Sequence, residues 1–291
     1  MSVLHGVSLL VAAGLCWVLI ALVISVAAKR RLDLDFIQAG AALLTASVAG
    51  IVLRFRDLGG VPVPVQLAVF GAGVGNYLMI KLMNAGMARG HNGAVWGITQ
   101  SALIFPFAMG MLFFGVAPTV CRIAGLLLIL TAIALFSMAK ERKGGAGGNW
   151  LRPTSGAFLF AGLSQCCANL PSYLGSYEMS SVHRAFLVQA GVLASFGVNA
   201  ALTRAPLRPK GAWLPLAVLG GVNIVSLFFF FYRGLNILAA LGCGSIGYPV
   251  AMGSCIAGFL LCSRFVLRER MGVPACAALL AVLSGITVIS L

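Results

Sequence analysis

Residues Lys140–Pro153 read KERKGGAGGNWLRP and form the most polar and glycine-rich stretch of the chain, near the midpoint of its 291 residues. Glycine-rich segments of this kind behave as flexible connectors, so the stretch predicts a linker between two halves. Five apolar runs of transmembrane length lie on each side of it. The sequence therefore predicts a first five-helix repeat over residues 1–139, a cytoplasmic linker over 140–153 and a second five-helix repeat over 154–291.

The apolar runs predict an all-α integral membrane protein with ten transmembrane helices. Sixty per cent of the residues are hydrophobic and 9% are charged, whereas a soluble domain carries about a quarter charged residues. A helix needs about 20 apolar residues to cross a bilayer. The predicted spans are 6–28, 36–54, 64–86, 92–114, 118–139, 154–176, 184–203, 212–236, 239–262 and 272–291.

The basic residues predict the orientation of these spans. Fourteen of the twenty Lys and Arg lie in alternate connections: Lys29, Arg30, Arg31, Arg89, Lys140, Arg142, Lys143, Arg152, Arg204, Arg208, Lys210, Arg264, Arg268 and Arg270. Five lie in the other connections, namely Arg54, Arg56, Arg122, Arg184 and Arg233, and Lys81 lies inside an apolar run. Cytoplasmic loops collect Lys and Arg, so both termini are expected outside, with the first span retained as a membrane helix.

The net charge of +14 does not indicate a nucleic-acid partner, because the basic residues are dispersed over loop ends and form no basic domain. Anionic lipid headgroups are the expected partners of these charges. The eight cysteines lie in or beside apolar runs without a C-x-x-C pair, so we expect neither a metal site nor a cofactor.

The two halves show local similarity at an offset of 152 residues. This offset pairs Lys81 with Arg233, Asn84 with Asn236, and Trp96 with Tyr248. With five spans per half, the second repeat is expected to be inverted in the membrane. Inverted repeats are typical of secondary transporters, whose substrate site lies near mid-membrane between the halves.

Residues Val69–Gly115 read VFGAGVGNYLMIKLMNAGMARGHNGAVWGITQSALIFPFAMGMLFFG, and Leu227–Gly234 read LFFFFYRG. Together with ten spans in two halves, these stretches resemble the drug/metabolite transporter superfamily with its EamA-like fold. The closest resemblance is to the sugar-uptake branch that holds the L-rhamnose–proton symporters and the glucose/ribose porters. The resemblance implies alternating access and sugar uptake. The chain lacks the long loops of the rhamnose transporter.

Carboxylates are expected only in loops or at span ends, at Asp33, Asp35, Asp57, Glu141, Glu178 and Glu269. Proton relays in membranes use buried Asp, Glu or His, so a carboxylate-driven antiporter or symporter is disfavoured. Facilitated diffusion, exchange and coupling to another ion stay open. An enzyme is not expected, because the acids and histidines are scattered over different connections.

Neutral polar residues inside the spans are the better candidates for a sugar site. Trp96 and Gln100 share one helix face by their i, i+4 spacing, as do Gln165, Asn169 and Tyr173. The predicted substrate-binding residues are Asn76, Tyr77, Lys81, Trp96, Gln100, Gln165, Asn169, Tyr173, Asn223, Arg233 and Tyr248. For Lys81 and Arg233 the alternative is an interfacial anchor that snorkels to the headgroups.

The function that these features favour is a secondary transporter of a small polar metabolite, with sugar uptake across a bacterial inner membrane as the leading hypothesis. The alternative is an exporter or exchanger of amino acids or anionic metabolites. In that case Lys81 and Arg233, without a buried acid, would suit an anion.

Overall fold

The computed structural model describes residues 2–30, 32–53, 60–89, 92–140, 149–174, 179–203, 210–265 and 272–291. These residues form helices and no strand, which confirms the helical fold class for them. The helices of the first half are α1 (Val3–Lys29), α2 (Leu34–Leu53), α3 (Val63–Met87), α4 (Asn92–Gln100), η2 (Ser101–Leu103), α5 (Ile104–Phe113) and α6 (Val120–Lys140). Those of the second half are α7 (Leu151–Tyr173), α8 (Ser181–Thr203), α9 (Trp213–Val225), η3 (Ser226–Phe231), α10 (Tyr232–Ala240), η4 (Gly244–Ile246), α11 (Gly247–Phe265) and α12 (Val273–Ile289).

The described residues form ten helical rods that correspond to the ten predicted apolar runs, and three of these rods are composite. The fourth rod runs through α4, η2 and α5, the eighth through α9, η3 and α10, and the ninth through η4 and α11. In the fourth rod, Pro106 lacks the N–H that would bond to the carbonyl of Ala102, and the 3₁₀ turn η2 lies at this point. In the eighth rod, η3 is a π-helical segment, a feature that often accompanies functional sites.

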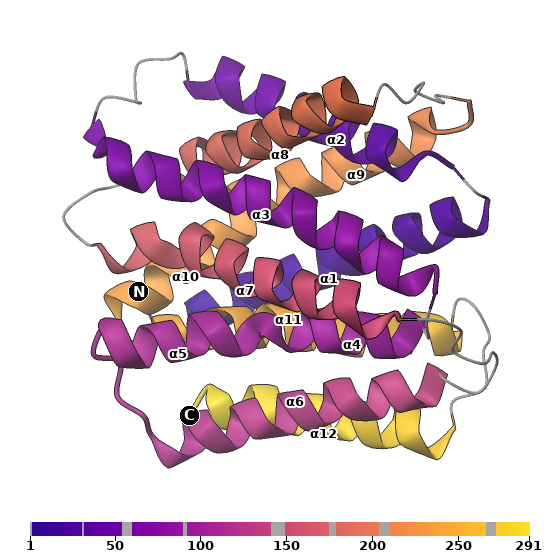
Figure 1. The fold of residues 1–291 in the computed structure, drawn as a ribbon. Coiled ribbons are helices and arrows are strands. Elements are labelled where there is room, and N and C mark those ends of the chain that lie inside the picture. The colour runs from indigo at the N-terminus through magenta and orange to yellow at the C-terminus, as the bar shows by residue number, and fades with distance from the viewer. Residues whose placement is uncertain are drawn as a thin grey trace.

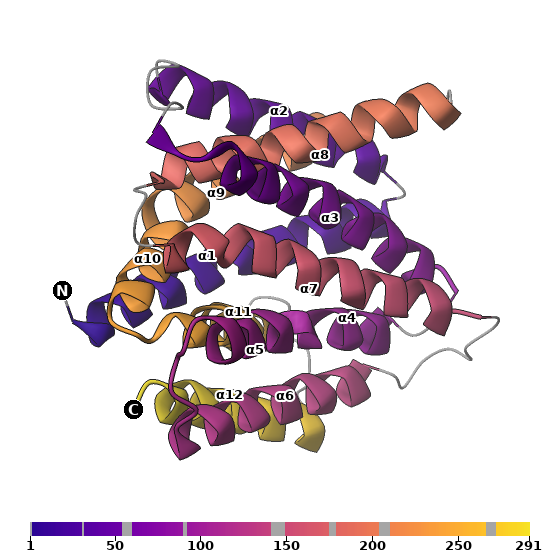
Figure 2. The same ribbon diagram turned by 60° about the vertical axis from the view of Figure 1, so that its left-hand side comes forward.

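The rods run alternately up and down through one bundle, with α2, α8 and α9 at one side and α6 and α12 at the other (Figure 1). Both chain termini lie at the same end of the bundle, which we call the terminal end (Figure 2). Helix α6 ends and α7 begins at the opposite end, which we call the linker end. Most of the predicted linker, residues 141–148, lies outside the described residues.

Seven described helical segments are long and apolar enough to cross a membrane: Val3–Ile24, Leu34–Leu53, Val63–Met87, Val95–Phe113, Ser181–Thr203, Trp213–Ala240 and Gly244–Cys262. Two more, Val120–Leu135 and Cys276–Ile289, are apolar but shorter within the described part of the chain. The most polar rod is α7, which carries Gln165 and Asn169 in its interior. It lies in the middle of the bundle between α3 and α4–α5.

Large apolar side chains cover the outside of the bundle, whereas small residues fill much of its interior. Leu202 is 80% exposed, Phe113 is 77% exposed and Leu112 is 75% exposed. Ala13, Ala72 and many other alanines are fully buried instead. Close approach of helices through small residues is typical of packing in lipid, where apolar exposure carries no penalty.

The helix contacts show an internal repeat. If each rod is replaced by its counterpart, the rod five places away in the chain, the main contacting pairs become other contacting pairs. Helix α3 packs on α7 and α8, and its counterpart α9–α10 packs on α1 and α2. Helix α7 packs on α4–α5, and its counterpart α1 packs on α11. Helix α4 packs on α6, and their counterparts α11 and α12 pack on one another. Two further pairs, α2 with α8 and α6 with α12, each join a rod to its own counterpart.

Candidate functional site: a cavity between the two halves

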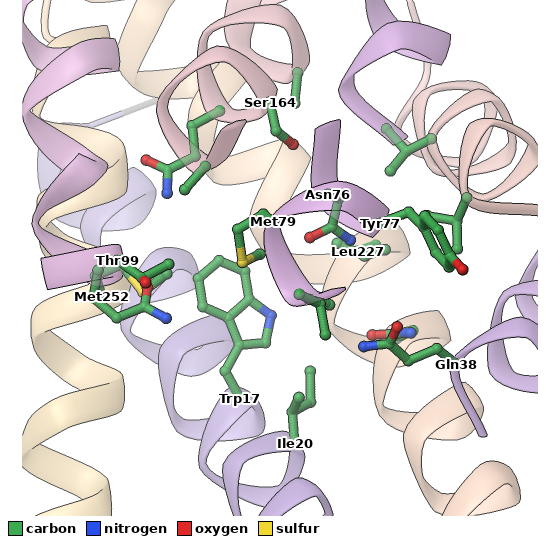
Figure 3. Close-up of a pocket in the computed structure, with 18 of the residues that line it drawn as sticks. Trp17, Ile20, Gln38, Asn76, Tyr77, Met79, Thr99, Ser164, Leu227 and Met252 are labelled. Atoms are coloured by element: carbon green, nitrogen blue, oxygen red, sulfur yellow. The ribbon is translucent and has the colours of Figure 1, made fainter. Parts of the chain in front are cut away.

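A cavity of about 290 Å³ opens between rods from both halves of the chain. The first half contributes Trp17, Gln38, Asn76 and Gln100, among other residues, and the second half contributes residues of α7, α8, α9–η3–α10 and α11. In Figure 3, Trp17 extends into the space between Thr99 and Met252 on one side and Asn76 and Gln38 on the other. The volume lies near the lower end of the range for ligand pockets, about 300–1,000 Å³, so it suits a small molecule.

Aromatic side chains from three rods form one wall of this cavity. The rings of Trp17 and Phe231 lie 4.8 Å apart between their centroids. Phe231 in turn meets Tyr248 edge-on, with centroids 5.1 Å apart and an interplanar angle of 84°. Trp96 adds a further aromatic lining residue from α4. Such faces can stack against the apolar side of a sugar ring or another small solute.

The polar lining is neutral. The amides are Gln38, Asn76, Gln100, Gln165, Gln189 and Asn223, and the described lining residues include no Asp, Glu, Lys, Arg or His. The hydroxyls of Thr99 and Ser164 already donate hydrogen bonds, to the carbonyls of Val95 at 2.8 Å and Ala72 at 2.7 Å. By contrast, Gln165 Oε1 and the Tyr77 hydroxyl are buried without a partner. The hydrogen-bonding capacity of these two groups is therefore not met by the described residues.

Seven of the eleven predicted binding residues line the cavity: Asn76, Tyr77, Trp96, Gln100, Gln165, Asn223 and Tyr248. The other four do not. Asn169 and Tyr173 follow Gln165 on α7 toward the terminal end and are not among the residues that line the cavity. Lys81 donates a hydrogen bond from Nζ to Asn199 Oδ1 and lies 5.9 Å from the centroid of the Tyr77 ring. Arg233 lies in α10 with its side chain exposed.

Arg184 was expected in a connection between spans, and this expectation is wrong. Helix α8 already begins at Ser181, so Arg184 lies in its first turn and is completely buried. Its Nη1 donates to Ser172 Oγ at 2.8 Å and its Nη2 to Asn236 Oδ1 at 2.9 Å. Its guanidinium carbon also lies 4.8 Å from the centroid of the Tyr232 ring, which lines the cavity.

The Arg184 cluster therefore lies at the terminal end of the cavity and joins α7, α8 and α10. Ser172 Oγ donates to Asn236 Oδ1 at 2.9 Å, which closes a triangle of three hydrogen bonds. Within the described part of the chain, no carboxylate pairs with the guanidinium, and its Nε has no hydrogen-bond partner. The positive charge is held by neutral oxygens and an aromatic face.

Two prominent lining residues, Trp17 and Gln38, were not predicted from the sequence. Trp17 shares a helix face with Ile20, Ala21 and Ile24, which also line the cavity, in the apolar middle of α1. Gln38 is the single amide of α2. A lone amide or indole in an apolar span is the signal that could have identified both residues.

Comparison with family models gives no match to this chain, and comparison with curated protein sequences gives none either. The fold is similar to that of a protein whose crystal structure is known. The TM-score is 0.75, the alignment covers 97% of this chain and 95% of the other, and the sequence identity is 14%. At this identity the similarity concerns the fold alone.

Proposed function

We propose that the chain is an integral membrane protein that transports a small polar metabolite by alternating access, with a sugar as the leading substrate class. The observation that carries the proposal is the cavity between the two halves, lined by neutral amides and aromatic rings. Transporters of this class bind their substrate between repeats, near mid-membrane. The resemblance to the sugar-uptake branch of the drug/metabolite transporters supports the same function.

The distribution of apolar residues supports the membrane location. Side chains such as Leu202, Phe113 and Leu112 would expose a continuous apolar surface to water, which soluble monomers avoid. In lipid the same surface is favourable, and the amides Gln165 and Asn169 of α7 face the interior of the bundle. A bacterial inner membrane is the setting that we propose.

The exchange of helix contacts between the halves supports an inverted repeat. Each main pair of rods has a counterpart pair five places later, or joins two counterparts to one another. Since each half has an odd number of rods, the second half would have the opposite orientation in a bilayer. Rocking of one half against the other would then expose the cavity to either side in turn.

The orientation that we propose places both termini outside and the linker end in the cytoplasm. Among the described basic residues, Arg30, Arg89, Arg152 and Lys210 lie at the linker end. A reporter fused after Leu291 should therefore be active in the periplasm, because positively charged loops stay on the cytoplasmic side. Cytoplasmic activity of that fusion would require the opposite orientation.

Substitutions in the cavity test the proposed binding site. We expect Trp96→Ala and Gln165→Ala each to weaken sugar binding about tenfold, which corresponds to about 1.4 kcal/mol. Trp96→Ala removes an aromatic contact surface from the cavity, and Gln165→Ala removes an unpartnered hydrogen-bond acceptor. Binding is measured by isothermal titration calorimetry on purified protein, with D-glucose, D-ribose and L-rhamnose as probes. Thr131→Val is the control, because Thr131 is exposed on α6 and bonds only its own helix. Unchanged affinity in both cavity variants would rule out this site.

The buried charge of Arg184 favours a second candidate, the transport of an anionic metabolite or an amino acid. Within the described part of the chain the guanidinium has no carboxylate partner, so it can stabilise negative charge nearby. The ring of Tyr232, over which the guanidinium lies, lines the cavity. D-Glucose and D-glucuronate distinguish the two candidates, because both form pyranose rings and differ only in the hydroxymethyl or carboxylate group at C6. Preference for glucuronate would favour the anion transporter over the sugar transporter.

A further inference from the structure

A row of unpartnered polar atoms continues from the cavity along α7. Gln165 Oε1, both amide atoms of Asn169 and the Tyr173 hydroxyl are buried without a hydrogen-bond partner. The three residues are spaced i, i+4 and i+8, so they share one face of the helix. Gln165 lines the cavity and Tyr173 is the last residue of α7, so the row leads from the cavity to the terminal end.

Helices from both halves close over the far end of this row. A Cβ atom at Gly110 of α5 would lie 2.6 Å from the Tyr173 hydroxyl and 2.9 Å from Ser245 Cβ. The Ser245 hydroxyl, in η4, is itself buried without a partner. The Tyr173 ring stacks on Phe114 with centroids 4.4 Å apart and an interplanar angle of 8°. The polar groups therefore gather where α5 and η4 pack closely against Tyr173.

Helix packing alone does not explain why unpartnered polar groups are buried at these positions. A buried polar group without a partner costs about 1–3 kcal/mol, and more where the surroundings are lipid. The Asn169 amide lies beside the Tyr173 hydroxyl, but the two do not reach hydrogen-bond geometry. Other hydroxyls of α7 are satisfied, since Thr154 donates to the Trp150 carbonyl at 2.8 Å and Ser164 to the Ala72 carbonyl. A leucine at position 169 would suit an apolar interior better than an unpaired amide.

We propose that Gln165, Asn169, Tyr173 and Ser245 form a second binding subsite for the hydroxyl groups of a neutral solute. The subsite would be used when α5 and η4 move away from α7, as the solute passes between the cavity and the terminal end. Amides and hydroxyls both donate and accept hydrogen bonds, which matches the hydroxyls of a polyol and requires no charge. This inference rests on the proposed transport function.

The test compares Asn169→Leu and Tyr173→Phe with the parent protein in membrane vesicles of either orientation. Radiolabelled D-glucose, D-ribose and L-rhamnose are the probes. For sugar that enters from the terminal end, we expect KM to rise about tenfold in each variant, which corresponds to a loss of about 1.4 kcal/mol of binding free energy. For entry from the linker end KM should stay within about twofold, because the cavity is unchanged. The unfolding temperature of Asn169→Leu should match or exceed that of the parent, because an unpaired amide is removed.

The Thr131→Val variant is again the control and should match the parent in KM from both sides and in unfolding temperature. Parent KM values on both sides, together with a lower unfolding temperature for Asn169→Leu, would assign the row a structural role and overturn the subsite. The proposed function would survive that result as long as Trp96→Ala still weakens binding. If the parent protein moves none of the three sugars, the sugar-transport function fails, and the subsite fails with it.

Discussion

Gly73→Ala is expected to destabilise the protein by about 3 kcal/mol or to prevent its folding, because a methyl group at this position has no space. Gly73 of α3 and Gly191 of α8 face one another where the two helices cross. A Cβ at Gly73 would meet the carbonyl oxygen of Val188, and a Cβ at Gly191 would meet that of Phe70. The obstructing atoms are backbone, so no side-chain rotation can relieve the clash. The helices would have to separate, and their other contacts would be lost.

Gly71→Ala is the matched control, two residues earlier on the same helix. A Cβ at Gly71 meets nothing within 4 Å. The Gly71→Ala substitution should itself favour the helix by about 1 kcal/mol, because alanine has a higher helix propensity than glycine. Yield of monodisperse protein and thermal unfolding in detergent would measure both variants. Equal behaviour of the two would show that α3 and α8 do not cross as closely as described.

Asn236→Leu is expected to cost about 3 kcal/mol of stability, because it leaves the buried Arg184 guanidinium with fewer partners. Asn236 Oδ1 accepts hydrogen bonds from both Arg184 and Ser172, each at 2.9 Å. Removing one partner of a buried charge typically costs about 3–5 kcal/mol. Thermal and chemical unfolding of the purified protein would measure the loss.

Two companion variants separate the charge effect from a packing effect. Asn236→Asp supplies a carboxylate beside the guanidinium and should retain the stability of the parent or increase it. The double variant Asn236→Leu, Arg184→Met removes the charge together with its acceptor and should recover most of the loss. If Asn236→Asp is as unstable as Asn236→Leu, the cluster does not hold a charged guanidinium.

The helices were predictable because their signal is local. An apolar run of about 20 residues between polar connections is sufficient to indicate a membrane helix. The predicted run 92–114 corresponds to Asn92–Phe113, although the 3₁₀ turn within it was not foreseen. The predicted run 184–203 begins three residues late, because the positive charge of Arg184 indicated a connection. The burial of that charge depends on Ser172 and Asn236, which only the tertiary fold brings to it.

The candidate site was predictable in part for the same reason. Helical spacing places Gln165, Asn169 and Tyr173 on one face, and the structure agrees. The spacing does not tell which of them lines a cavity, because that depends on how closely α5 and η4 approach α7. Lys81 offered two interpretations from the sequence, and the spacing could not show its hydrogen bond to Asn199, which joins α3 to α8. Trp17 has no polar residue at helical spacing beside it, so its lone indole was the single signal in the sequence.

A thermal-shift screen of the purified protein tests the central claim most directly. The ligands are neutral monosaccharides, amino acids, organic phosphates and quaternary amines. A ligand at about 100 times its Kd stabilises the folded protein by about 2.7 kcal/mol, which is readily detected as a higher unfolding temperature. We predict that at least one monosaccharide stabilises the parent and that Trp96→Ala reduces this stabilisation to about half, as a tenfold weaker affinity requires. Stabilisation by quaternary amines alone, or by no ligand of any class, would contradict a cavity built for a neutral polar metabolite.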